Sequence, residues 1–268
     1  MSGPFGPARL GSARLGLTRF GAGMLLTAML AAVLFAAALW AVPVRAAEPG
    51  AGRDDEASIT LREDDFDIDV RYPRLGQPAV DDDLARWAAH IVAAFRQGLA
   101  EPEIGGEPVN GTRDPNGRHF VNELKVTHDV TRASARAATV TFSIWTYTGG
   151  AHGNLDIITQ SYDMASGARL APEDIFADTE GALALLAPYC YEALAETLGE
   201  DRAEDMLRGG TSPDADNYAS LALTPDGVRV HFSPYQVAPW SAGPQRVDVP
   251  LGVLIDAGPR LELWGVTR

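Results

Sequence analysis

A short glycine-rich segment holds the residues of this chain whose types and spacing could support chemistry. Gly149, Gly150 and Gly153 surround His152, directly after a strand-like run that ends at Tyr147. Glycines this close together predict a sharp turn, positive φ angles or close approach by another part of the chain. His152 would then stand at a surface where it donates or accepts a hydrogen bond. The other interpretation is a bulge or sheet crossing with His152 hydrogen-bonded in the interior.

The patterns of known catalytic sites are missing from the sequence. The histidines, none of which is spaced as a His-x-x-x-His or His-Glu-x-x-His zinc motif, are His90, His119, His128, His152 and His231. There is also no Gly-x-Ser-x-Gly nucleophile elbow, no dinucleotide fingerprint and no phosphate-binding loop. We therefore assign no catalytic residue, no metal ligand and no cofactor, and we keep an enzyme site around His152 as the alternative hypothesis.

The first 46 residues have the pattern of a secretory signal peptide. They contain four arginines and no acidic residue, and an apolar run extends from Ala22 to Trp40. Val44-Arg45-Ala46 then places suitable side chains at the positions that a signal peptidase reads. We expect cleavage after Ala46 and a periplasmic or secreted protein. The alternative is an uncleaved anchor, which would be the chain's only contact with a membrane.

The charge of the chain excludes one class of partner. The net charge is −14, and removal of the four N-terminal arginines makes it about −18. Nucleic-acid binding depends on basic residues that neutralise phosphates, so we expect no nucleic-acid partner. A cationic partner is compatible with this surface, and simple solubility is the other explanation. Cys190 is the only cysteine, so no internal disulfide forms, and we expect a buried, inert thiol.

Hydrophobic periodicity predicts mixed helices and strands. After a flexible lead-in at residues 47–57, Phe66, Ile68 and Val70 alternate with aspartates as in a half-buried strand. Asp81-Asp82-Asp83 is expected to cap a helix that contains Leu84, Trp87 and Phe95, and Trp87 and Phe95 are expected in the core. A long loop, residues 100–117, should follow, and then three strands at residues 120–130, 138–146 and 155–163.

The second half of the chain should contain one long helix and a hairpin. The helix is expected at residues 180–198, with Pro188 marking a kink or a late start. Residues 202–216 are expected to be irregular. Thr224-Pro225-Asp226-Gly227 separates two strand-like runs and predicts a hairpin turn. Because strands and helices do not alternate regularly, we expect an α+β fold with a mostly antiparallel sheet and two main helices.

The segment from Tyr147 through Gly149-Gly150, His152 and Gly153 to Asn154 resembles the signature of an extracytoplasmic domain family. This family forms the lysozyme-binding part of the RsiV anti-sigma factor and the non-catalytic front part of the PdaC peptidoglycan deacetylase. Further matching segments lie at Tyr162–Phe176, at Thr224–Phe232 and at Tyr235–Pro250. The resemblance runs from about Phe66 to Leu254.

The resemblance implies a front sub-region at residues 58–155, similar to PdaC, and a back sub-region at residues 156–268, similar to RsiV. It also implies an exported binding module of the cell envelope whose partner is a lysozyme-type basic protein or peptidoglycan. The candidate binding or structural residues are Tyr147, Gly149, Gly150, His152, Gly153, Asn154, Tyr235 and Trp240. For Tyr235 and Trp240 the alternative role is packing in the core.

Overall fold

The fold combines helices with two β-sheets. The computed structural model describes residues 55–100, 117 and 120–266, which all lie within one compact unit, residues 45–268. The expected α+β class is confirmed. Within the described ranges, no helix combines the length and the apolar character needed to cross a bilayer.

The larger sheet has six strands that lie side by side in chain order. Neighbouring strands are antiparallel, except that β2 and β3 are parallel. The helix α1 (Pro78–Ala100) connects this parallel pair. The strands are β1 (Glu56–Arg62), β2 (Phe66–Pro73), β3 (Asn122–Arg132), β4 (Ala137–Tyr147), β5 (Asn154–Asp163) and β6 (Arg169–Leu170).

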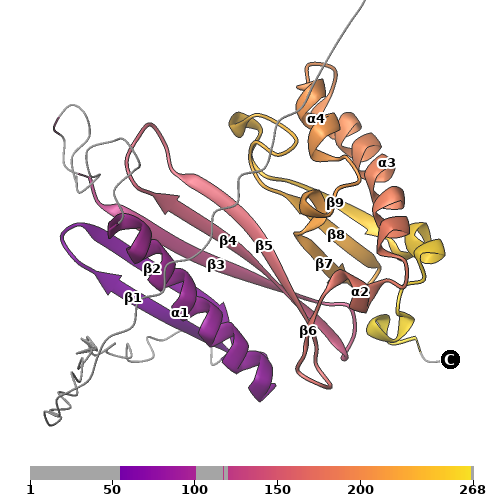
Figure 1. Cartoon of the computed structure of the whole chain (residues 1–268), viewed down its shortest axis with the longest axis horizontal. Helices are drawn as coiled ribbons and strands as arrows, with labels where there is room; N and C mark the ends of the chain where they lie inside the picture. Colours follow the sequence, from indigo (N-terminus) through magenta and orange to yellow (C-terminus); the bar gives the residue numbers. More distant parts are fainter. Residues whose placement is uncertain (1–54, 101–116, 118–119, 267–268) are drawn as a thin grey trace, which may run out of the picture. The chain divides into compact units, whose positions relative to one another are not determined.

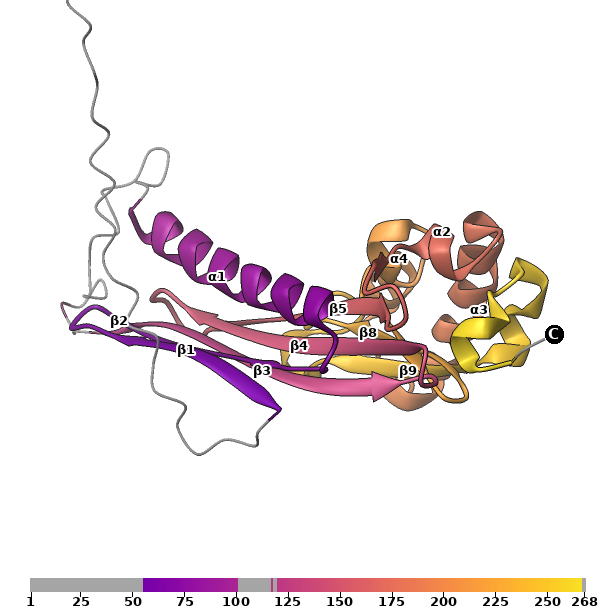
Figure 2. The same cartoon turned by 90° about the horizontal axis from the view of Figure 1, so that it is seen from below.

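One face of this sheet is apolar and lies under α1 (Figure 2). The alternation that the sequence shows in β2 places Ile68 and Val70 on this face, where both are fully buried. From α1, Leu84 is also fully buried, and the ring of Trp87 stacks on Phe142 of β4 at 3.9 Å between centroids. The expected core position of Trp87 is therefore confirmed.

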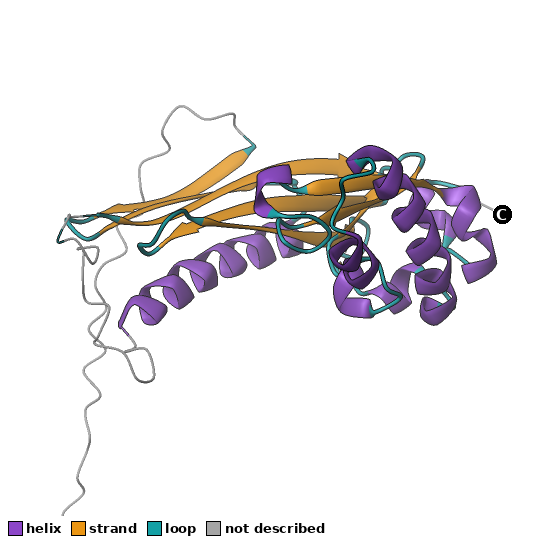
Figure 3. Ribbon diagram, turned by 90° about the horizontal axis from the view of Figure 1, so that it is seen from above, coloured by secondary structure: helices purple, strands orange, loops and turns teal. Residues whose placement is uncertain are grey.

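The smaller sheet has its own core. Figures 1 and 3 show the remaining helices around three antiparallel strands. The α3 helix contributes Leu186, Cys190 and Leu194 to this core, opposite apolar residues of the strands. The elements are α2 (Pro172–Ile175), α3 (Thr179–Leu198), α4 (Glu204–Gly210), β7 (Leu221–Thr224), β8 (Gly227–Phe232) and β9 (Gln245–Pro250), with 3₁₀ helices η1 (Ala215–Tyr218), η2 (Trp240–Ala242), η3 (Leu251–Ala257) and η4 (Leu261–Trp264).

Threonine hydroxyls join the two sheets. The outer edge of β7 meets the face of the larger sheet that is turned away from α1. Thr131 and Thr159 donate to the carbonyls of Leu223 and Leu221 at 3.0 and 2.9 Å, and the Leu223 amide donates to Thr139 at 3.0 Å. Thr139 is fully buried. This polar stripe of the sheet, which alternation alone would assign to solvent, is therefore an internal seam.

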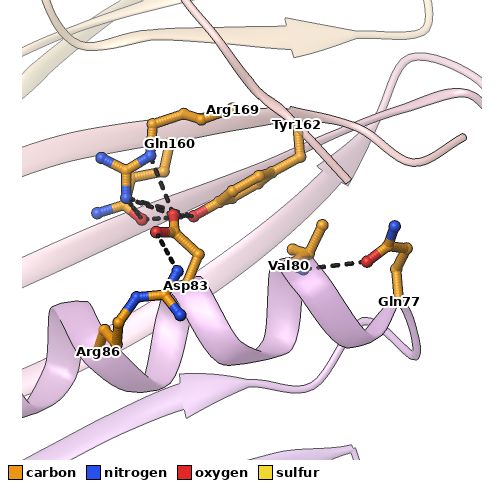
Figure 4. A network of polar contacts seen from close by, with 7 residues as sticks. All are labelled: Gln77, Val80, Asp83, Arg86, Gln160, Tyr162 and Arg169. Atoms are coloured by element: carbon orange, nitrogen blue, oxygen red, sulfur yellow. Dashed lines mark hydrogen bonds and ion pairs between the residues drawn. The ribbon is translucent and has the colours of Figure 1, made fainter. Parts of the chain in front are cut away.

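A charged network ties α1 to the far edge of the larger sheet (Figure 4). The Asp83 carboxylate on α1 accepts hydrogen bonds from the Tyr162 hydroxyl at 2.9 Å and from Arg169 at 2.8 Å. Burial alone would raise the pKa of Asp83, but the hydrogen bonds from Tyr162, Arg169 and Arg86 outweigh it and hold the pKa below its usual value. Arg169 also donates to Gln160 at 2.9 Å.

The ends of some elements differ from the sequence-based predictions. Helix α1 begins at Pro78, before the expected cap, and Gln77 accepts the Val80 amide instead. Asp81 lies inside the first turn and accepts the amides of Leu75 and Gly76, which fixes the chain entering the helix. The β1 strand begins at Glu56, one residue before the expected end of the lead-in at residue 57. The strands of the larger sheet also continue to Leu170, beyond residue 155, where the front sub-region was expected to end.

In the second half, the long helix and the hairpin are confirmed. Helix α3 runs through Pro188, so the prediction of a late start was wrong. The expectation of irregular structure at residues 202–216 was also wrong, because α4 forms there with Leu207 fully buried. Of the loop predicted at residues 100–117, only the two end residues lie within the described part of the chain.

Candidate functional site

The glycine-rich segment is the turn between β4 and β5. Gly149 and Gly150 have φ angles of +100° and +93°, a region that side chains with a Cβ rarely adopt. Gly153 is buried, and a Cβ there would meet the Trp145 ring and would lie 2.7 Å from the carbonyl oxygen of Thr146. The predicted sharp turn and close approach are therefore both present.

His152 is exposed at the tip of this turn, so the interpretation of an interior histidine was wrong. Its Nδ1 lies 2.8 Å from the Gly153 carbonyl oxygen. Because a carbonyl oxygen only accepts, this contact is a hydrogen bond in the tautomer that carries its hydrogen on Nδ1. The imidazole ring stacks on the indole of Trp240 at 4.7 Å, with 17° between the planes. This stacking brings the β4–β5 turn together with the loop that connects β8 and β9.

That loop presents Tyr235 in an unusual backbone conformation. Tyr235 is the one residue other than glycine in the described part of the chain with a positive φ, +70°, and its exposed fraction is 53%. Its amide donates to the Ala238 carbonyl at 3.1 Å. The loop is anchored beneath by Gln236, whose side chain donates to the carbonyl of Asn217 at 2.9 Å, and by buried Val237 and Ala238. The surrounding contacts therefore hold the strained backbone in place.

Four aromatic rings gather at this point, and we call them the aromatic platform: Trp145, His152, Tyr235 and Trp240. The centroid of Trp240 lies 5.8 Å from that of Tyr235 and 6.4 Å from that of Trp145. The Trp145 indole N–H donates to Glu123 at 3.2 Å, which fixes the orientation of that ring. Trp240 is half-buried in the middle, and Tyr235 and His152 are exposed around it.

The structure brings together only some of the residues that the sequence singled out. His152, Tyr235 and Trp240 meet in the platform. Tyr147 instead packs edge-on against Phe120 at 5.7 Å, and the Asn154 amide donates to Asp156 at 2.8 Å. The glycines Gly149, Gly150 and Gly153 shape the turn. Sequence reasoning missed Trp145, although its place two residues before Tyr147 puts both on one face of β4.

A metal site, or a catalytic site around His152, would need suitable side chains close together in the fold. Over the described residues, no three His, Cys, Asp or Glu side chains are close enough together to hold a metal ion. Among the histidines, His119 lies outside the described residues. His128 is near Glu56, 3.9 Å from its carboxylate, whereas His231 pairs across strands with Arg246. These two and His152 therefore lie in separate environments.

Comparisons with known proteins agree with the resemblance to PdaC. Residues 173–252 match the model of a family described as "Protein of unknown function (DUF3298)". The chain is 27% identical over 193 residues to the peptidoglycan-N-acetylmuramic acid deacetylase PdaC of Bacillus subtilis strain 168. The match covers 71% of this chain and only 38% of the deacetylase, so the chain spans well under half of that relative. The resemblance to RsiV stays a prediction.

Two crystal structures of DUF3298 family proteins have the same fold. One, from Bacteroides fragilis NCTC 9343, has a TM-score of 0.53 at 19% identity and covers 78% of this chain and 95% of its own. The other, from Pseudomonas aeruginosa PAO1, has a TM-score of 0.50 at 20% identity and covers 75% of this chain and 89% of its own. Sequence and fold together make this chain similar to DUF3298 proteins and to the matching part of PdaC.

Proposed function

We propose that the chain is an extracytoplasmic binding module of the cell envelope that uses the aromatic platform to hold a basic protein of the lysozyme type. The signal-like segment at residues 1–46 supports export. The similarity to a deacetylase that, by its name, acts on peptidoglycan supports the envelope as the setting. The platform itself supports binding.

The observation that carries this proposal is the conformation of Tyr235. A non-glycine residue with positive φ costs of order 1–3 kcal/mol and persists only where the surrounding structure enforces it. Here the enforced conformation displays a side chain that is 53% exposed. Exposed tyrosines and tryptophans on rigid supports are the residues that most often supply binding energy at protein interfaces. The strain therefore supports a role in recognition.

The arrangement of the rings favours a protein partner over a glycan. Sugars stack on a free aromatic face, but the central Trp240 ring is surrounded by His152, Tyr235 and Trp145. Tyr235 instead offers a side chain that can enter a pocket on a partner. The net charge of −14 would speed the encounter with a basic protein. Peptidoglycan is the second candidate, because the relative PdaC acts on it by name.

The first prediction concerns Tyr235. Titration calorimetry with a lysozyme-type protein should give heat that disappears or weakens by about tenfold in Tyr235→Ala, a loss of about 1.4 kcal/mol. Val266→Ala, which trims another exposed apolar side chain, is the matched control and should bind like the unmodified protein. Higher salt should weaken binding, because screening shortens the reach of surface charge.

Other results of the same titrations would reject the proposal. Heat with soluble wall fragments but none with the protein would move the assignment to the glycan. Equal losses in Tyr235→Ala and Val266→Ala would remove the platform from recognition. No binding at all, together with amide or ester hydrolysis abolished by His152→Ala, would favour the alternative of an envelope hydrolase or deacetylase-type enzyme.

A further inference from the structure

A second surface, made of residues other than those of the aromatic platform, lies along α3. An open groove with a volume of about 790 Å³ runs between this helix and η3. We call it the α3 groove. Its lining residues are Leu185, Pro188, Tyr189, Glu192, Ala193, Ala195, Glu196 and Val253. None of them belongs to the platform, so the groove is independent of the function proposed above.

The apolar character of α3 extends to the side that faces this groove. A helix at the surface of a domain ordinarily has one apolar stripe and one polar face. The inner stripe of α3 contains Leu186, Cys190 and Leu194, which are buried in the back core. Leu185 and Tyr189 lie on the outer side with Val253 of η3, and all three remain only half-buried. The groove thus leaves apolar side chains partly uncovered.

The carboxylates of the groove have no ion-pair partner among the described residues. Glu192 and Glu196 are exposed, and neither forms an ion pair with any described residue. The groove lining contains no basic side chain. Pro188 has no amide hydrogen, so the exposed Ala184 loses the donor that an uninterrupted helix would provide to its carbonyl. A ligand that fits these groups must bring hydrogen-bond donors and positive charge.

We propose that the α3 groove binds a basic amphipathic segment of a partner protein. Apolar side chains of that segment would cover Leu185, Tyr189 and Val253, and its lysines or arginines would pair with Glu192 and Glu196. Such helix-in-groove contacts combine apolar anchors at helical spacing with charges along the rim. A second copy of this chain fits poorly, because a protein with net charge −14 would bring more negative charge to an acidic groove.

The test is fluorescence anisotropy with a labelled amphipathic peptide made of leucine and lysine at helical spacing. The full protein should bind it, and Glu192→Lys with Glu196→Lys should weaken binding by about tenfold or more. The matched control is Glu63→Lys with Asp64→Lys, which changes the net charge equally on an exposed turn of the larger sheet and should weaken binding by no more than about twofold. A scrambled peptide of the same composition should bind more weakly.

A variant of the apolar wall separates shape from charge. Tyr189→Ser should also weaken binding of the peptide by several-fold, while circular dichroism reports that the helix content of the protein is unchanged. The proposal would be overturned if Glu63→Lys with Asp64→Lys weakened binding as much as Glu192→Lys with Glu196→Lys. It would also be overturned if the scrambled peptide bound as tightly as the amphipathic one. Either result would mean that general charge attraction explains the binding. Sedimentation that shows a dimer lost in Glu192→Lys with Glu196→Lys would overturn it in favour of self-association.

Discussion

The three glycines of the β4–β5 turn have different physical roles. Gly149 and Gly150 supply positive φ angles, and Gly149 also leaves room for the ring of Phe120. Gly153 has no left-handed conformation and is required by space alone, since the Trp145 ring and the chain at Thr146 occupy the position of a Cβ. The turn therefore depends on both properties of glycine, conformational freedom and absence of a side chain.

The second prediction follows from this difference. Gly153→Ala should lower the free energy of unfolding by about 1–3 kcal/mol, because backbone and an indole must move to admit the methyl group. Gly150→Val should cost about 1–2 kcal/mol through its backbone conformation, since open space surrounds that position. His152→Ala should cost less, about 1 kcal/mol. Urea denaturation of the three variants decides the order, and an equal or larger loss for His152→Ala would contradict it.

His231 is a residue whose titration affects stability. Burial, followed by the nearby charges of Arg229 and Arg246, lowers the pKa of His231 to about 4, and the carboxylates of Asp248 and Asp129 oppose this only in part. The imidazole is therefore neutral in the folded protein at neutral pH. In the unfolded chain, where its pKa is near 6.5, it binds a proton more readily.

The third prediction is the resulting pH dependence. Because the unfolded state binds more protons between about pH 6.5 and pH 4, this residue's contribution to stability is complete above pH 6.5 and is lost as the pH falls toward 4. His231→Gln should flatten the fall in denaturation midpoint over this window. Carboxylates with lowered pKa values, such as Asp163, change the stability at lower pH. Their effect can therefore be separated from that of His231. An unchanged slope in His231→Gln would contradict the assignment.

Single residues also show what the sequence could not provide. The glycines predicted the turn because their requirement is local. The meeting of His152 with Trp240 depends on a contact between residues 88 positions apart in the numbering, which no local pattern records. The positive φ of Tyr235 was equally invisible, since tyrosine has no preference for it. The candidate residues were therefore named from the sequence, but their grouping into one platform required the structure.

At the scale of elements, α1 is attached to its sheet by both apolar and charged contacts. Periodicity predicted the apolar stripe of α1, because Leu84 and Trp87 follow each other at helical spacing. The partner of Asp83 could not be predicted, because Tyr162 and Arg169 lie in later strands. Burial, followed by the hydrogen bond to Asp83, raises the pKa of Tyr162, so the phenol stays protonated as a donor. The short elements α4 and β9 lacked enough residues for a periodic signal.

The fourth prediction tests the charged attachment of α1. Tyr162 is fully buried, and Tyr162→Phe removes its hydroxyl with little change of shape. We expect a loss of about 1.5–3 kcal/mol, the usual value for a hydrogen bond to a charged group. Tyr72→Phe, on β2, removes a hydroxyl for which the described residues offer no hydrogen bond, and it should leave the unfolding midpoint nearly unchanged. Similar losses in both variants would mean that the network adds no stability.

At the scale of the whole described unit, two cores are joined through a polar seam. The sequence predicted the α+β class because both helices and most strands carry clear patterns. It did not predict the seam, since Thr131, Thr139 and Thr159 occupy positions of their strands that read as solvent-facing. Their burial depends on β7, which lies more than sixty residues after Thr159 in the numbering. Only the packed structure turns these hydroxyls into internal partners.

The fifth prediction concerns this seam. Thr139→Val keeps the shape of the side chain but leaves the amide of Leu223 and the hydroxyl of Ser161 without their partner. A buried unpaired polar group costs about 1–3 kcal/mol, so the variant should be destabilised by at least that amount. Thr127→Val, on the exposed part of β3, is the control and should have little effect on melting. A neutral Thr139→Val would show that water replaces the lost contacts.

The same hydroxyls have a consequence for the protein's behaviour among other molecules. A strand at the end of a sheet exposes unpaired backbone groups that can accept a strand from another chain, which is a common start of aggregation. On β7, the outward carbonyls of Leu221 and Leu223 and the amide of Leu223 are already bonded to threonines. Intruding strands find no free backbone groups at these points. The seam that holds the molecule together therefore also protects it in a crowded compartment.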